Sequence, residues 1–128
     1  MTAIEVVTAL IRDDQGRVLV VRKRGTDRFM LPGGKPAPGE AFAETLAREL
    51  AEELGLHLMG AEWFGRFEAA AANEPGRRVV GQVHRAVVEG EPHPAAEIVE
   101  FKWIGARGPF PVPLAPLLET QILPALAG

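Results

Sequence analysis

The chain has 128 residues, of which 47% are hydrophobic, and its formal net charge at pH 7 is −3. This length can bury one full hydrophobic core but not two, so we expect a single domain spanning residues 1–128. The acidic balance argues against general affinity for nucleic acid polymers, and the absence of cysteine excludes disulfides and thiol catalysis. With neither a long apolar stretch nor an export signal, a cytoplasmic protein without membrane contact is expected.

The N-terminal half begins with two β-rich segments. Residues 4–11 and 18–23 are apolar and flank a turn at 13–16, which predicts a β-hairpin. An acidic segment from Glu40 to Leu56 follows, and its apolar spacing is that of a helix. This part of the chain is therefore expected to fold as strand, strand and helix.

The C-terminal half alternates strands with turns and ends in a helix. Strands are predicted over 58–68, 79–88 and 99–104, with a turn at 73–76 between the first two. A rigid, proline-rich connection at 105–113 leads to a helix over 114–126, in which Pro116 and Pro124 predict a kink or an early end. Because the order shows no regular βαβ repeat, we expect helices packed on a mixed sheet.

The acidic helix carries three carboxylates close together. Glu49, Glu52 and Glu53 stand at i, i+3 and i+4 and so lie on one arc of the helix. Their mutual repulsion needs a cation, and Arg48, four residues from both Glu44 and Glu52, cannot neutralise them all. A hard divalent cation could, whereas the alternative is a solvated acidic face. The predicted buried stripe beside them consists of Ala43, Leu46, Ala47, Leu50 and Leu54.

Glycines bracket this helix. Gly33 and Gly34 precede it, and adjacent glycines let a backbone carbonyl approach a ligand without an obstructing Cβ. Gly55 follows Leu54 where a left-handed residue closes a helix, and Leu56 supplies the accompanying apolar contact. A loop–helix–loop element with both ends specified favours a metal site over a solvated face.

The segment from Gly34 to Leu56 resembles the Nudix hydrolase signature GX5EX7REUXEEXGU, where U is aliphatic, at every specified position. Such a match should arise by chance on the order of once in ten million chains. The segments 29–34 and 97–104 are similar to the family's strand before the glycine turn and its acidic loop. The resemblance implies an α/β/α sandwich with a mixed sheet, and hydrolysis of a phosphoanhydride bond with Mg²⁺, or alternatively Mn²⁺, as cofactor.

The resemblance also implies roles for individual residues. Glu49, Glu52 and Glu97 are all candidates for the general base, and Glu100 is a rival to Glu97. Arg48 and Glu40 are expected to orient the helix glutamates. The metal ligands implied by the family pattern are the Gly33 carbonyl, Glu49, Glu52 and Glu53.

Phosphate-binding cations are expected from Arg22, Arg24 and Lys35, although such residues also occur as solvated charges at strand ends. Strand alternation places Lys23 on the opposite face from Arg22 and Arg24. His84 is interpreted as an ordinary strand residue. For Trp63, Phe64 and Phe67, core packing is favoured over stacking on a base.

The substrate is inferred by elimination. Three features that mark other substrate classes in the family are missing from this chain. They are the tyrosine after the signature that is typical of dinucleoside polyphosphate enzymes, the proline typical of ADP-ribose enzymes and the stretch typical of NADH enzymes. Nucleoside triphosphates, including oxidised ones, therefore rank slightly ahead of nucleotide-linked sugars. A noncatalytic nucleotide sensor and a protein-interaction domain are the alternatives from other classes. A homodimer is expected, because the chain is small and because members of the family commonly form dimers.

Overall fold

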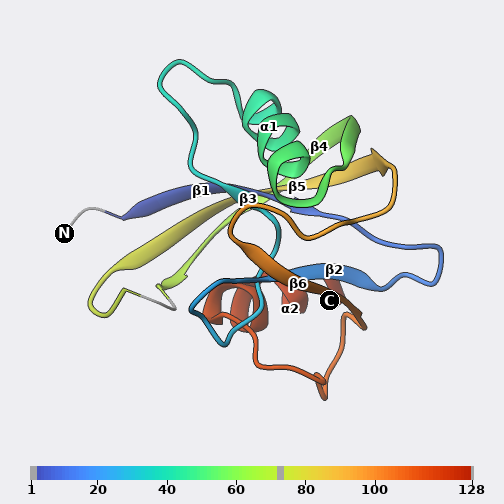
Figure 1. Ribbon diagram of the computed structural model, residues 1–128. Coiled ribbons are helices and arrows are strands. Elements are labelled where there is room, and N and C mark those ends of the chain that lie inside the picture. The colour runs from blue at the N-terminus through green and yellow to red at the C-terminus, as the bar shows by residue number, and fades with distance from the viewer. Residues whose placement is uncertain (1–2, 72–73, 128) are drawn as a thin grey trace.

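The computed structural model describes residues 3–71 and 74–127 and contains two β-sheets flanked by helices (Figure 1). A four-stranded sheet has the order β3-β1-β5-β4, and a second sheet pairs β2 with β6. Strand β1 runs parallel to β5 and antiparallel to β3, so the larger sheet is mixed. In chain order the elements are β1 (Ile4–Leu10), β2 (Val18–Lys23), β3 (Gly33–Gly34), α1 (Phe42–Leu54), β4 (His57–Ala70), β5 (Arg78–Glu89), β6 (Ile98–Ile104), η1 (Leu117–Ile122) and α2 (Leu123–Ala127).

Two apolar cores lie on the two sides of β1 and β2. Side chains alternate along β1, so Val7 and Ala9 belong to one core and Leu10 to the other. Helix α1 covers the first core, and η1 with α2 covers the second, which makes the α/β/α sandwich that the sequence predicts (Figure 1). Burying each leucine side chain contributes about 1.5–3 kcal/mol. The leucines that α1 buries completely are Leu46, Leu50 and Leu54.

Helix α1 begins and ends as its sequence indicates. The Glu44 carboxylate accepts a hydrogen bond from the Ala41 N–H at 2.9 Å, which caps the N-terminus. At the other end Gly55 adopts φ 67°, and the Leu56 N–H donates to the Leu50 carbonyl at 3.2 Å. The predicted buried stripe was too wide, because Ala43 and Ala47 are exposed.

The predicted hairpin between β1 and β2 is wrong, although both strands and the turn exist. An isolated bridge from Arg12 to Val18 joins the two segments, after which β1 pairs with β3 and β5 while β2 pairs with β6. The reason is burial on both faces. Val18, Leu19, Val20 and Val21 are all at most 1% exposed, so β2 must lie between two cores rather than at the edge of a two-stranded ribbon.

The C-terminal helix begins three residues later than predicted. Leu114 bridges Phe29 in a parallel arrangement, and the Ala115 N–H donates to the Phe29 carbonyl at 2.8 Å. This extended conformation agrees with the restriction that Pro116 imposes on the residue before it. From Leu117 to Ile122 the helix is of the π type, and it continues as α2, so the two prolines do not end it.

The remaining strands extend slightly beyond their predicted limits. The predicted turn at 73–76 includes Asn73, which lies outside the described residues, and the chain turns at Glu74, where the Arg77 N–H donates to the Glu74 carbonyl at 3.0 Å. Phe64 and Phe67 pack against a core as predicted, whereas Trp63 is 59% exposed and does not. In the part of the chain that the structure describes, no helix is long and apolar enough to span a membrane.

Candidate active site

Two glycines bring the strand β3 into contact with both β1 and α1. Gly33 has φ 147°, and a Cβ there would overlap the Val7 carbonyl oxygen. A Cβ at Gly34 would overlap the Glu49 carboxyl group. Since the clash at Gly33 is with backbone atoms, a side chain there would separate β3 from β1, whereas a side chain at Gly34 would displace the Glu49 carboxyl group.

Glu53 is the most deeply buried of the helix carboxylates. Its side chain is 2% exposed, and Oε1 accepts a hydrogen bond from the Gly33 N–H at 3.1 Å. The other oxygen, Oε2, is buried and has no hydrogen-bond partner within residues 3–71 and 74–127. Burial raises the pKa of Glu53 to about 7, although the Gly33 N–H favours the charged form, and the nearby Glu49 adds to the rise.

This arrangement fits a bound cation. A buried carboxylate oxygen without a hydrogen-bond partner reduces the stability of the folded state. Hard divalent cations take carboxylate oxygens as ligands, so a bound cation would satisfy this oxygen. Burial also raises the pKa of Glu49. Within the described residues no three acidic, histidine or cysteine side chains already form a metal cluster. The fit therefore rests on the unpartnered Oε2 of Glu53 rather than on a complete set of ligands.

Without metal, the stability of the protein should fall as the pH rises from about 4.5 to about 7. The pKa of Glu53 is about 7 in the folded state and 4.5 in the reference state, so across this interval the folded state holds a proton that the unfolded state releases. Glu53 should thus remove about 3 kcal/mol of unfolding free energy between pH 4.5 and pH 8. Urea unfolding in EDTA would measure this, with Glu53→Gln as reference. If the unfolding free energy depended on pH in the same way in both proteins, the raised pKa of Glu53 would be contradicted.

Arg48 and Glu40 fasten the loop before α1 to the helix. The guanidinium donates from Nε and Nη2 to the two oxygens of Glu40, both at 2.8 Å, and from Nη2 to the Lys35 carbonyl at 3.2 Å. The hydrogen bond from Arg48 lowers the pKa of Glu40 to about 2. Arg48 also lies 3.3 Å from Glu49 and 3.6 Å from Glu52, whereas the expected pair with Glu44 is replaced by the cap at Ala41.

Glu97 reaches the site because its loop is attached to the end of α1. The N–H groups of His93 and Ala95 donate to the carbonyls of Leu54 and Glu53, both at 2.9 Å, which satisfies orphan carbonyls at the helix end. The Glu97 carboxylate then lies 3.4 Å from the Lys23 ammonium group. Its rival Glu100 faces elsewhere, because it pairs with Arg22 at 2.7 Å.

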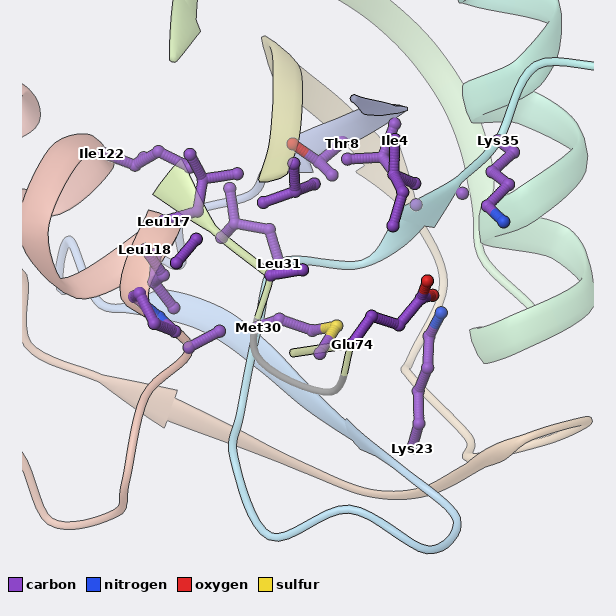
Figure 2. A pocket seen from close by; sticks show the side chains of 18 residues that line it. Ile4, Thr8, Lys23, Met30, Leu31, Lys35, Glu74, Leu117, Leu118 and Ile122 are labelled. Atoms are coloured by element: carbon purple, nitrogen blue, oxygen red, sulfur yellow. The ribbon is translucent and has the colours of Figure 1, made fainter. Parts of the chain in front are cut away.

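A polar cavity of about 340 Å³ opens beside α1 and is lined by both acids and bases. A second, mainly apolar cavity of about 190 Å³ adjoins it and extends between the sheet and η1 (Figure 2). Lys23 and Lys35 line both cavities, so a ligand could span them with its anionic part held by the lysines. The residues around the polar cavity are Val6, Lys23, Gly34, Lys35, Glu49 and Glu97.

The structure separates the expected site residues into two groups. Lys35, Glu49 and Glu97 line the polar cavity, and Glu53 lies close enough for Glu49 and Glu97 to affect its pKa. Glu52 is 55% exposed on its side chain and faces Arg48. Glu52 does not line the polar cavity, but it lies close enough to Glu49 to affect the pKa of that carboxyl group.

Arg22 and Arg24 do not occupy the positions expected for phosphate-binding cations. The Arg22 guanidinium is held by Glu100 and by the Thr26 carbonyl, and Arg24 is not among the described residues around either cavity. Lys23, in contrast, lines both cavities. The alternation of side chains along β2 predicts that Lys23 lies on the opposite face from the two arginines. It does not predict which face of β2 lies toward the glutamates of α1. Leu19 and Val21 pack in the core that α1 covers, and Lys23 lies on the same face of the strand as these two residues. This pattern could have identified Lys23 from the sequence.

Comparison with known proteins identifies the family. The model of the NUDIX domain family matches residues 2–116, so the chain belongs to this family. Nudix hydrolases, which include relatives of the 8-oxo-dGTP diphosphatases, act on phosphoanhydride bonds. The MutT NUDIX hydrolase from Burkholderia pseudomallei has a similar structure, with a TM-score of 0.78 at 26% identity, over 99% of this chain and 98% of that one.

Two relatives with different names come from Haemophilus influenzae and Mycolicibacterium vanbaalenii. The 8-oxo-dGTP diphosphatase of Haemophilus influenzae is 38% identical over 69 residues, which are 51% of this chain and 51% of that protein. The isopentenyl-diphosphate Delta-isomerase of Mycolicibacterium vanbaalenii is 32% identical over 103 residues, 72% of this chain and 56% of that protein. The chain thus spans about half the length of these two relatives.

Proposed function

We propose that this protein is a metal-dependent hydrolase that cleaves a phosphoanhydride bond in a small nucleotide. The observation that carries the proposal is the buried, unpartnered Oε2 of Glu53 beside a cavity that contains two lysines. Lysine ammonium groups attract phosphates, and a buried carboxylate attracts the divalent cation that phosphates bring. A site with both kinds of group suits a polyphosphate better than a neutral ligand.

The cation would be held by Glu49 and Glu53, with the Gly33 carbonyl and Glu52 as further ligands. Mg²⁺ is the expected ion and Mn²⁺ the alternative, since both take carboxylate and carbonyl oxygens. When bound, such an ion neutralises charge on phosphate oxygens and lowers the pKa of a coordinated water. Arg48 and Glu40 orient the glutamates through the hydrogen bonds described above.

The protein's own groups supply the remaining chemistry. Lys23 and Lys35 bind phosphate oxygens and hold the substrate across the two cavities. A general base must reach the attacking water, and placement around the polar cavity favours Glu49 or Glu97 over Glu52. Burial raises the pKa of Glu49, which makes it a stronger base than an exposed glutamate.

Nucleoside triphosphates, including oxidised ones, are the proposed substrates, with nucleotide-linked sugars as the alternative. The name of the Haemophilus relative, an 8-oxo-dGTP diphosphatase, supports this choice. The name of the Mycolicibacterium relative refers to a prenyl diphosphate and a different reaction. A noncatalytic sensor would bind the same nucleotides without turnover.

Turnover should require a divalent cation and should rise toward mildly alkaline pH, because the attacking water must lose a proton while the carboxylates stay charged. The test is a panel of dGTP, 8-oxo-dGTP, dATP, UDP-glucose and isopentenyl diphosphate with Mg²⁺, with Mn²⁺ or with excess EDTA. Release of phosphate or pyrophosphate from the triphosphates only with metal is expected. Full turnover in EDTA, thermal stabilisation without turnover, or conversion of isopentenyl diphosphate alone would each contradict the proposal.

A homodimer is also proposed, and the exposed apolar side chains suggest where it would form. Among the described residues, the large hydrophobic side chains that are exposed are Met59, Trp63 and Val87, all on β4 and β5. Strand β4 is an edge of its sheet, and such an edge can pair with another chain. Light scattering should show a dimer that Trp63→Lys converts to a monomer. A monomeric wild-type protein at all practical concentrations would contradict this.

A further inference from the structure

The apolar cavity contains a buried hydroxyl group that nothing in the fold explains. Thr8 lies in the middle of β1, is 7% exposed, and lines the cavity (Figure 2). Its Oγ1 is buried and has no hydrogen-bond partner among the described residues. Leaving a hydroxyl buried in this way costs free energy that a valine of the same shape would not cost.

The position of Thr8 is fixed. Its backbone pairs with Gly33 of β3 on one side and Val83 of β5 on the other, so the side chain cannot turn toward solvent without breaking the sheet. Most of the surrounding walls are apolar, with Met30, Leu31 and Leu117 among them, and the charged residues that also line the cavity are Lys23, Lys35 and Glu74. A partner for the hydroxyl must therefore come from whatever occupies the cavity.

The adjoining polar cavity indicates which kind of chemical group occupies the apolar cavity. If phosphates lie between Lys23 and Lys35, the group attached to them extends into the apolar cavity, which these two lysines also line. For a nucleoside triphosphate this group is the nucleoside. Aliphatic walls discriminate weakly between bases of similar size.

We propose that Thr8 is a substrate-binding residue that hydrogen-bonds the base of the bound nucleotide, whether this base carries a keto or an amino group. A hydroxyl can rotate to donate to a keto oxygen or to accept from an amino group, unlike a fixed carboxylate or ammonium group. The protein then takes guanine-type and adenine-type nucleotides with similar affinity. This inference rests on the proposed function, because it assumes that a nucleotide occupies the site.

The test measures the affinity for the non-hydrolysable α,β-methylene analogues of dGTP and dATP by calorimetry with Mg²⁺. Thr8→Val should raise the Kd for both analogues by about five- to tenfold, the value of one net hydrogen bond. Thr8→Ser, which keeps the hydroxyl, should stay close to the wild-type Kd. In the same Thr8→Val protein without ligand, the melting temperature should rise by about 2–5 °C, because the unsatisfied hydroxyl is gone.

A second threonine on α1 provides the control for stability. Thr45 is also buried, but its hydroxyl donates to Glu40 at 2.8 Å, so Thr45→Val should lower the melting temperature. An unchanged Kd in Thr8→Val, or a loss for only one analogue, would overturn the inference while leaving the hydrolase proposal intact. Wild-type protein that binds neither analogue would overturn both.

Discussion

Glu53→Gln should reduce turnover by roughly a hundredfold or more, about 3 kcal/mol of transition-state stabilisation. The substitution keeps the volume of the side chain and its acceptor for the Gly33 N–H, but it removes the negative charge at the buried, unpartnered oxygen. Metal affinity should fall together with turnover, because the charge is what holds a divalent cation. Turnover at saturating Mg²⁺ and metal binding by calorimetry are the two measurements.

The matched control is Glu44→Gln on the same helix. Glu44 caps the N-terminus of α1 through the Ala41 N–H, a role that glutamine also performs. Its charge lies away from both cavities, so near-normal turnover is expected. Equal activity in the two variants would contradict the metal site at Glu53.

Gly33→Ala should destabilise the protein by about 3–5 kcal/mol and should abolish activity in whatever protein folds. A Cβ at this position would overlap the Val7 carbonyl, and its φ of 147° is one that L-residues rarely adopt. The contact lies between paired strands, so it can be relieved only by separating β3 from β1. That movement would also remove the hydrogen bond that Glu53 accepts from the Gly33 N–H.

Gly39→Ala separates the effect of crowding from that of backbone conformation. Gly39 also has a positive φ, 76°, but a Cβ there would meet no atom within 4 Å. This substitution should cost only about 1–2 kcal/mol, the penalty for a left-handed residue with a side chain. Urea unfolding of both variants measures the difference. Similar losses would mean that β3 is not held closely against β1.

The sequence by itself determined the catalytic element and the class of fold. The signature fixes identities at local spacing, so the helix within residues 34–56, its glycine end at Gly55 and the glycine pair before it could all be predicted, whereas its first residue and its N-terminal cap were not. Helix periodicity and glycine stereochemistry act over a few residues, which is why local pattern was sufficient there. Helices packed on a mixed sheet followed from the order of the predicted elements, and the α/β/α sandwich followed from the family resemblance.

Only the tertiary structure decided which segments meet across the chain. Strand pairing depends on contacts between residues far apart in sequence, so the pattern at 4–23 predicted a hairpin where β2 instead pairs with β6. Which face of β2 meets the glutamates could not be read from alternation, so Lys23 was missed and Arg22 and Arg24 were named. The burial of Glu53 to 2% exposure, and with it a pKa of about 7, arises because α1 packs against β3 and β1. Local sequence specifies the chemical groups, whereas long-range packing sets their desolvation and therefore their charge.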